Sequence, residues 1–227
     1  MKHAVLITAS PRTTPHSASS LLSKKQATTF EEQGIAVHTI HVRSNISGGH
    51  VEADYQAMLQ ADALVITFPL YVFCMPGLLT RFLQDYCSYW QSNMAHRLNN
   101  QKVYAVINCG FPEPGINQEA ARVIKSFSQK IQSQYRFSLL IGGGGMLVSM
   151  RHAPFMVKTF RDITQVYHRI AQDILSPQED HIEDISLAVN FPPKLYLFLG
   201  GKGWIRTARK NGLKKADMFK RPYMEGK

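Results

Sequence analysis

The sequence has little cysteine and lacks a metal-binding pattern. Only three cysteines occur among 227 residues, and no two of them are spaced as Cys-x-x-Cys. The nine histidines form no His-Glu-x-x-His motif or other ligand spacing. An odd number of widely separated cysteines does not indicate a disulfide framework. We therefore expect reduced, mostly buried thiols and no structural metal.

Long apolar runs are also missing. No stretch approaches the roughly 20 apolar residues that a membrane-spanning helix requires. The apolar segment after Met1 ends at polar Ser10, which is too short for a secretory signal, so we expect a cytoplasmic protein. Hydrophobic residues make up 44% of the chain, enough for a sizeable core, and this argues against global disorder.

Acidic residues are scarce toward the C-terminus. The whole chain carries a net charge of +10, and the part from Lys194 onward holds ten basic and two acidic residues, a net +8. The preceding 193 residues therefore carry only +2. The basic character belongs to an appendage and not to the main domain.

Five short apolar runs alternate with five helical patterns along the chain. The predicted strands cover residues 3–8, 35–42, 63–68, 102–109 and 137–141. The predicted helices cover residues 17–33, 51–60, 77–94, 116–132 and 156–175. This alternation is typical of a doubly wound, five-stranded parallel sheet with helices on both faces. We predict such an α/β domain over residues 1–178 and a basic C-terminal extension over residues 179–227.

Unusual loops follow four of the predicted strands. They cover residues 9–17, 69–76, 110–115 and the four-glycine run 142–145. In doubly wound sheets, ligands bind outside the carboxyl ends of the strands, where these loops lie. The glycine run permits either a tight turn or the close approach of a ring to the backbone.

The first loop has the features of a phosphate site. It offers hydroxyl donors at Ser10, Ser17 and Ser19 and a positive charge at Arg12, and it precedes a helix N-terminus that favours an anion. An ordinary strand-to-helix turn with a serine cap would look similar. Neither Gly-x-x-x-x-Gly-Lys-Ser/Thr nor Gly-x-Gly-x-x-Gly occurs here.

Three segments in order resemble a known family. Thr8-Ala-Ser-Pro-Arg12 resembles the Gly-Ser-Pro-Arg phosphate loop of flavodoxin-like NAD(P)H-dependent FMN reductases and related oxidoreductases. Phe68-Pro-Leu-Tyr-Val72, followed by Met75-Pro-Gly77, resembles their second FMN loop, and Asn108-Cys-Gly-Phe-Pro-Glu113 resembles the third. The resemblance extends over about residues 1–175.

The resemblance implies a non-covalently bound FMN and a set of contacts to it. The phosphate would be held by Ser10, Arg12, Ser17, Ala18 and Ser19. The isoalloxazine ring would be lined by Pro69, Leu70, Tyr71 and Val72, with Asn108, Gly110 and Phe111 beside it. Backbone amides of residues 69–72 would reach the polar edge of the ring. The sequence departs from the family at Ala9, where a glycine is usual, and an alanine with positive φ would strain the loop.

The resemblance also implies an activity. NADH or NADPH would reduce the FMN, and the electrons would pass to a small-molecule acceptor such as a quinone, iron chelate, nitro or azo compound, or free flavin. No catalytic side chain is demanded, because the flavin carries the redox chemistry. A homodimer is expected from the resemblance. The alternative is a flavodoxin-like electron carrier without nicotinamide activity of its own.

The basic tail allows three interpretations. Leu195-Tyr-Leu-Phe-Leu199 and Trp204-Ile205, followed by basic residues, resemble a segment that lies at a membrane surface. A basic run also contacts nucleic-acid phosphates, but no base-reading motif accompanies this one, so we predict no nucleic-acid partner. The interpretation preferred on sequence alone is a tail packed on its own domain or on a partner subunit.

Overall fold

The chain folds into two compact units. The computed structural model describes residues 1–11, 17–48, 51–176 and 182–221. The first unit comprises Met1–Asn190, here the main unit, and the second comprises Phe191–Lys227, here the C-terminal unit.

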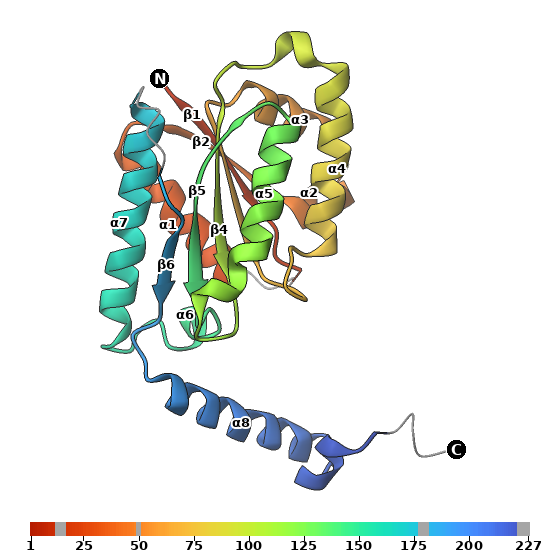
Figure 1. Ribbon diagram of the computed structural model, residues 1–227, viewed down its shortest axis with the longest axis vertical. Helices are drawn as coiled ribbons and strands as arrows, with labels where there is room; N and C mark the ends of the chain where they lie inside the picture. The colour runs from red at the N-terminus through yellow and green to blue at the C-terminus, as the bar shows by residue number, and fades with distance from the viewer. Residues whose placement is uncertain (12–16, 49–50, 177–181, 222–227) are drawn as a thin grey trace. The chain divides into compact units, whose positions relative to one another are not determined.

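The main unit is built on a single parallel sheet of six strands in the described part of the chain. The strands are β1 (His3–Thr8), β2 (Ala36–His41), β3 (Ala63–Pro69), β4 (Lys102–Asn108), β5 (Gln134–Gly142) and β6 (Ile185–Ala188). Their order across the sheet is β2-β1-β3-β4-β5-β6, and every neighbouring pair runs parallel (Figure 1). The predicted fold class is confirmed, with a sixth strand in addition to the five expected.

The sixth strand lies beyond residue 178, the predicted end of the α/β domain. β6 pairs with residues 139–142 of β5, although it is only four residues long. Asp184, just before it, accepts hydrogen bonds of 2.6 Å from both the Tyr135 hydroxyl and the Ser138 amide, and this ties the strand's start to β5. The compact unit that contains β6 ends at Asn190. A four-residue strand was too short to give a pattern in the sequence.

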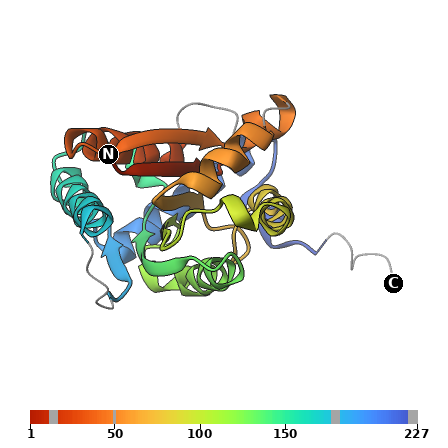
Figure 2. The ribbon, with the colours of Figure 1, turned by 90° about the horizontal axis from the view of Figure 1, so that it is seen from above.

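Helices cover both faces of the sheet. They are α1 (Ala18–Glu32), α2 (Val42–Gly48), α3 (Val51–Gln60), α4 (Gly77–Ser92), α5 (Gln118–Lys130), α6 (Met146–Ser149) and α7 (Met156–Leu175). α1 and α7 pack on one face, and α3, α4 and α5 pack on the other (Figure 2). The long helices lie where the sequence predicts them. α2 and α6 are additional, because helices of one or two turns carry no periodic signal.

Local signals in the sequence set the first βαβ turn. Ser17 caps α1 by accepting a hydrogen bond from the Ser20 amide at 3.1 Å, and Gly34 lies just past the helix with φ of +76°. Residues 63–68 of β3 are all buried, as expected for a central strand with helices on both sides. The buried strands thus fix the positions of the loops that follow their carboxyl ends.

The C-terminal unit consists of α8 (Pro193–Lys210) followed by a 3₁₀ turn, Lys215–Phe219. α8 ends in a Schellman motif: Gly212 has φ of +75°, and the Leu213 amide donates to the Ala208 carbonyl at 2.9 Å. Within the described ranges, no helix combines the length and apolarity needed to cross a membrane.

Candidate functional site

A cavity lies at the carboxyl edge of the sheet, meaning the edge where the parallel strands end. Its volume is about 220 Å³. It is lined by Ser10, Ser17, Ala18, Ser19, Pro69, Leu70, Tyr71, Asn108, Gly110, Gly144, Gly145 and Val148. These residues come from the loops after β1, β3, β4 and β5, from the last residues of β3 and β4, from the first turn of α1 and from α6. The fold therefore brings together segments that are far apart in the sequence.

Most of the predicted site residues share this cavity. Nine line it: Ser10, Ser17, Ala18, Ser19, Pro69, Leu70, Tyr71, Asn108 and Gly110. Val72 and Phe111 are not part of the lining, and their side chains are 93% and 50% exposed. Arg12 lies outside the described residues.

One end of the cavity is formed by serine hydroxyls and the N-terminus of α1. The first amide groups of a helix have no partner within the helix and, with the helix dipole, favour an anion. Ser17 is buried, and its hydroxyl lies 2.7 Å from that of Ser20. The Ser19 hydroxyl accepts a hydrogen bond from the Asn108 side-chain amide at 3.2 Å. This end is suited to a phosphate group.

Ala9 fits the loop without strain. The non-glycine residues with positive φ in the described chain are Val72, Phe73, Asn100 and Gln132, so Ala9 is not among them. Its side chain is buried, and its amide donates to the carbonyl of Thr67 at 3.0 Å. The departure from the family's glycine therefore costs little at this position.

Backbone amides of the segment after β3 are used within the protein. The Leu70 amide donates to the Asn108 carbonyl at 2.8 Å, and the Tyr71 amide donates to the Cys74 carbonyl at 2.8 Å. Pro69 has no amide hydrogen. The expectation that amides of this segment point at a ligand therefore fails for Pro69, Leu70 and Tyr71, because their donors are absent or already used.

Val72 and Phe73 form a strained turn beside the cavity. Their φ values are +48° and +60°, and the Cys74 amide returns a hydrogen bond to the Tyr71 carbonyl at 2.9 Å. Positive φ at both central positions is the geometry of a type I′ turn, which normally contains asparagine or glycine. A β-branched residue in this conformation is costly. Both side chains project into solvent, 93% and 62% exposed.

The four-glycine loop and the short helix α6 after it contribute residues that the predicted contact list omits: Gly144 and Gly145 from the loop and Val148 from α6. A Cβ atom on Gly144 would lie 2.8 Å from Asn108 Oδ1 and 3.0 Å from the Cys109 carbonyl oxygen. Gly143 has φ of +74°, and its amide donates to the Phe111 carbonyl at 2.6 Å. The glycines allow this backbone to lie directly against the loop after β4. The sequence feature that could have identified these residues is the run of four glycines directly after a predicted buried strand.

Comparison with known proteins places this architecture in a family. The chain matches the family described as having a flavodoxin-like fold over residues 2–133, more than half of its length. The chain belongs to the flavodoxin-like fold family. No curated protein matches it.

Solved structures share the fold of this flavodoxin-like protein at low sequence identity. An NAD(P)H:quinone oxidoreductase from Methanothermobacter marburgensis has 15% identity and a TM-score of 0.57, with 79% of this chain and 98% of that chain covered. The apo form of an NADH:FMN oxidoreductase has 15% identity and a TM-score of 0.57, with 86% and 99% covered. General stress protein 14 from Treponema denticola, in complex with FMN, has 16% identity and a TM-score of 0.54, with 77% and 99% covered.

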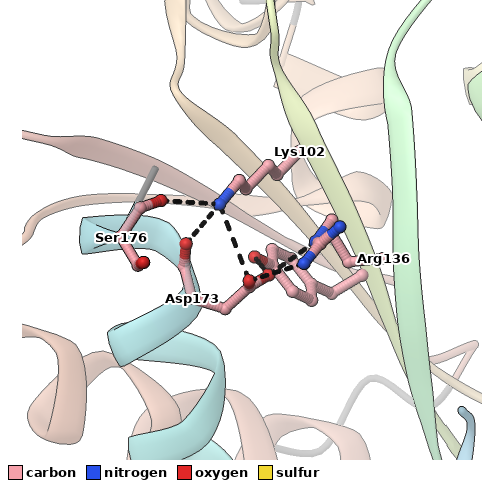
Figure 3. Close-up of polar contacts among 5 residues, drawn as sticks. Lys102, Arg136, Asp173 and Ser176 are labelled. Atoms are coloured by element: carbon pink, nitrogen blue, oxygen red, sulfur yellow. Dashed lines mark hydrogen bonds and ion pairs between the residues drawn. The ribbon is translucent and has the colours of Figure 1, made fainter. Parts of the chain in front are cut away.

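A second group of buried ionisable residues lies at the amino edge of this flavodoxin-like sheet, where the strands begin. Arg136 donates to both carboxylate oxygens of Asp173 at 2.8 Å, and the Tyr104 hydroxyl donates to the same carboxylate at 2.5 Å (Figure 3). The Lys102 ammonium donates to the backbone carbonyls of Asp173 and Ser176, the latter at 3.0 Å. This cluster ties the end of α7 to β4 and β5.

The pKa values in the amino-edge cluster follow from its pairing. Burial raises the pKa of Asp173, but hydrogen bonds from Arg136 and Tyr104 and the charge of Lys102 outweigh it, so the pKa lies below its ordinary value. Burial lowers the pKa of Lys102 more than the carboxylate raises it. Each charge has an opposite charge or carbonyl partner, so the cluster is structural and not a reactive site.

A larger cavity of about 460 Å³ also lies at the amino edge. Arg122, Lys125 and Tyr135 contribute to its lining, as does Ile182, the first described residue after 177–181. None of the predicted site residues belongs to it. The cavity at the carboxyl edge is therefore the candidate functional site of this flavodoxin-like protein.

Proposed function

We propose that the protein binds FMN non-covalently in the carboxyl-edge cavity and acts as an NAD(P)H-dependent oxidoreductase on small-molecule acceptors. The observation that carries the proposal is the convergence of a helix N-terminus, three serines and an apolar wall on one cavity. Bound there, the flavin would supply the redox chemistry by taking a hydride from NADH or NADPH and passing electrons on. The names of the quinone and FMN oxidoreductases among its structural neighbours support this proposal.

The residues present suit the two ends of FMN. Ser10, Ser17 and Ser19 would donate hydrogen bonds to the phosphate at the N-terminus of α1. Pro69, Leu70 and Tyr71 would lie against the ring, and Asn108 would hold the loops on either side in place through its bonds to Ser19 and the Phe68 carbonyl, both 3.2 Å. Gly144 and Gly145 leave room for a flat ligand close to the backbone.

The first test is the flavin content of the purified protein. Protein equilibrated with FMN and separated from free ligand is expected to keep the flavin absorption spectrum. The variant Ser17→Ala/Ser19→Ala should weaken FMN binding about 100-fold, since hydrogen bonds to a charged group are worth about 1.5–3 kcal/mol each. Ser23→Ala is the matched control, because Ser23 lies further along α1 and does not line the cavity. Equal FMN affinity in all three proteins would exclude this cavity.

The second test separates an oxidoreductase from an electron carrier. Anaerobic addition of NADH or NADPH should bleach the flavin absorption, and a quinone or azo dye should restore it. If neither nucleotide reduces the FMN-loaded protein while an added flavodoxin reductase does, the carrier alternative holds and the enzyme proposal fails. The acceptor and the preferred nucleotide are read from the same assay.

Three further expectations belong to this proposal. A homodimer follows from the family resemblance, and exposed Tyr71, Val72, Phe73 and Phe111 would supply apolar surface near the cavity for it. A cytoplasmic location and a separate role for the basic extension are also proposed. Light scattering on the purified protein measures the first of these directly, and a monomer would remove it.

A further inference from the structure

The C-terminal unit exposes large apolar side chains along its helix. Leu197, Phe198 and Trp204 of α8 are 57%, 58% and 70% exposed, and Phe219 in the following 3₁₀ turn is 76% exposed. The buried apolar side chain that α8 contributes is the small Ala208. Exposed apolar residues scattered singly are normal, but a run of them on one helix marks an interaction surface.

The same unit concentrates positive charge. Ten basic and two acidic residues occur from Phe191 to Lys227, which leaves +8 of the protein's +10 on this short segment. Asp217, the acidic residue in its described part, already pairs with Lys220 at 2.9 Å and accepts a hydrogen bond from the Lys214 amide at 2.7 Å. The basic residues of α8 therefore have little negative charge near them in the unit.

Apolar and basic residues occupy different parts of α8. Residues 195–199, Leu-Tyr-Leu-Phe-Leu, make its first half apolar on all sides. In the second half, Lys202, Arg206, Arg209 and Lys210 fall within an arc of about 100°, and Trp204 and Ala208 lie on the other side. Lys202 also lies over the ring of Phe198 at 4.5 Å, so one basic head group sits beside the apolar half. The basic arc of the second half therefore lies opposite Trp204 and Ala208, and a basic face opposite an apolar one is the pattern of helices that lie at lipid–water interfaces.

We propose that the C-terminal unit binds the surface of a bilayer containing anionic phospholipids. Leu197, Phe198 and Trp204 enter the interfacial layer, and the basic arc contacts the lipid phosphates. A second copy of this chain is a poorer partner, because the net charge of its main unit is +2 and does not complement the basic arc. Nucleic acid satisfies the basic arc but leaves the exposed leucine, phenylalanine and tryptophan side chains in water. The proposal does not depend on FMN.

The test uses the full chain and sedimentation with two kinds of vesicle. We expect binding to phosphatidylcholine vesicles that contain about one third phosphatidylglycerol and at least about tenfold weaker binding to phosphatidylcholine alone. Raising the salt from about 0.1 M to about 0.5 M should weaken binding by reducing the electrostatic attraction. A chain that stays in the supernatant with anionic vesicles at low salt overturns the proposal.

Two charge variants locate the binding surface. K202Q/R206Q/R209Q/K210Q removes the basic arc of α8 and should weaken vesicle binding about 100-fold or more. The control K24Q/K125Q/K130Q/R161Q removes the same number of exposed positive charges from the main unit and should weaken binding less than about threefold. Equal effects of the two variants would show that net charge and not α8 is responsible, and this overturns the proposal.

Two apolar variants distinguish a membrane from another polyanion. F198S/W204S should reduce binding to anionic vesicles at least about tenfold, because its apolar area no longer enters the bilayer. V123S/V157S removes exposed apolar side chains from α5 and α7 and should leave binding unchanged. If F198S/W204S binds vesicles as the parent does, and both bind a DNA duplex equally well, the surface is a nucleic-acid site and the proposal is wrong.

Fluorescence and light scattering complete the test. The chain has two tryptophans, Trp90 at 5% exposure in the core and Trp204 at 70%. Anionic vesicles should shift the emission to shorter wavelength, and W204F should remove the shift, since Trp90 is already buried. The proposal is wrong if light scattering finds the parent to be an oligomer and F198S/W204S a monomer, while vesicles leave the emission of the parent unchanged. In that case a second copy covers α8.

Discussion

The two edges of the central sheet use polar residues in opposite ways. At the amino edge, Arg136, Asp173 and Tyr104 are buried and satisfy one another. At the carboxyl edge, the hydroxyls of Ser10, Ser17 and Ser19 line a cavity. Buried charges stabilise a fold only when they are fully paired, whereas a ligand site needs polar groups that border a cavity. The difference separates residues that hold the fold from residues that are proposed to bind the cofactor.

The largest expected effect comes from breaking the amino edge. D173N leaves Arg136 and Lys102 buried without their counter-charge and should lower the free energy of unfolding by about 3–5 kcal/mol. Chemical denaturation measures this. FMN affinity of the folded fraction should not change, because Asp173 lies at the opposite edge from the cavity.

The control for that variant is D85N. Asp85 pairs with Arg81 at 2.9 Å on the exposed face of α4, and both side chains are at least half exposed. Its loss should cost less than about 0.5 kcal/mol. If D173N and D85N destabilise the protein equally, the buried cluster does not hold α7 to the sheet.

The second expected effect breaks the carboxyl edge. In G144V the Cβ atom alone would lie 2.8 Å from Asn108 Oδ1, and the two methyl groups add further bulk, so the glycine loop must move. We expect a loss of about 1–3 kcal/mol in stability and at least tenfold weaker FMN binding. Isothermal titration on the folded protein measures the affinity.

Gly115 provides the matched position for that experiment. A Cβ on Gly115 meets nothing within 4 Å, and the residue does not line the cavity. G115A should therefore change neither stability nor FMN binding appreciably. An FMN affinity for G144V equal to that of G115A would show that the glycine loop does not form a wall of the site.

The contribution of Asp173 at the amino edge to stability should depend on pH. Because the pKa of Asp173 is lowered in the folded state, its stabilisation is complete above its unfolded pKa near 3.8 and is lost as pH falls through the lower folded value. Below about pH 4, the wild type should lose stability more steeply than D173N. Urea midpoints across this range check the sign, and parallel curves would contradict it. Hydroxyls at the carboxyl edge do not titrate there.

The smallest expected effect concerns the strained turn at the carboxyl edge. V72G should raise stability by about 1 kcal/mol or less, since glycine accepts a φ of +48° without the cost of a β-branched side chain. Asn100 has φ of +61°, and asparagine tolerates this conformation, so N100G should have almost no effect. Thermal denaturation compares the two. A destabilised V72G would mean that the Val72 side chain makes contacts that offset its strain.

Much of the cavity lining could be predicted from the sequence because it lies on short loops that each follow a predicted strand. Ser17 ends the loop that follows β1, and Asn108 is the last residue of β4. Both lie at the cavity because parallel strands all end at the same edge of the sheet. Val72 and Phe111 belong to the right loops but point away, since loop conformation decides the direction of a side chain. Gly144 and Val148 were left out of the predicted contacts because they approach Asn108 only after the sheet has formed.

The alternation of strands and helices, the hydroxyl-rich loop after β1 and the separation of charge between main domain and tail can all be read from the sequence alone. These properties depend on residues close together in the chain. Only the tertiary structure decided that residues 185–188 extend the sheet, that Asp173 meets Arg136, and that the donors of Leu70 and Tyr71 are already used. Such contacts join residues distant in sequence, and no local preference specifies them.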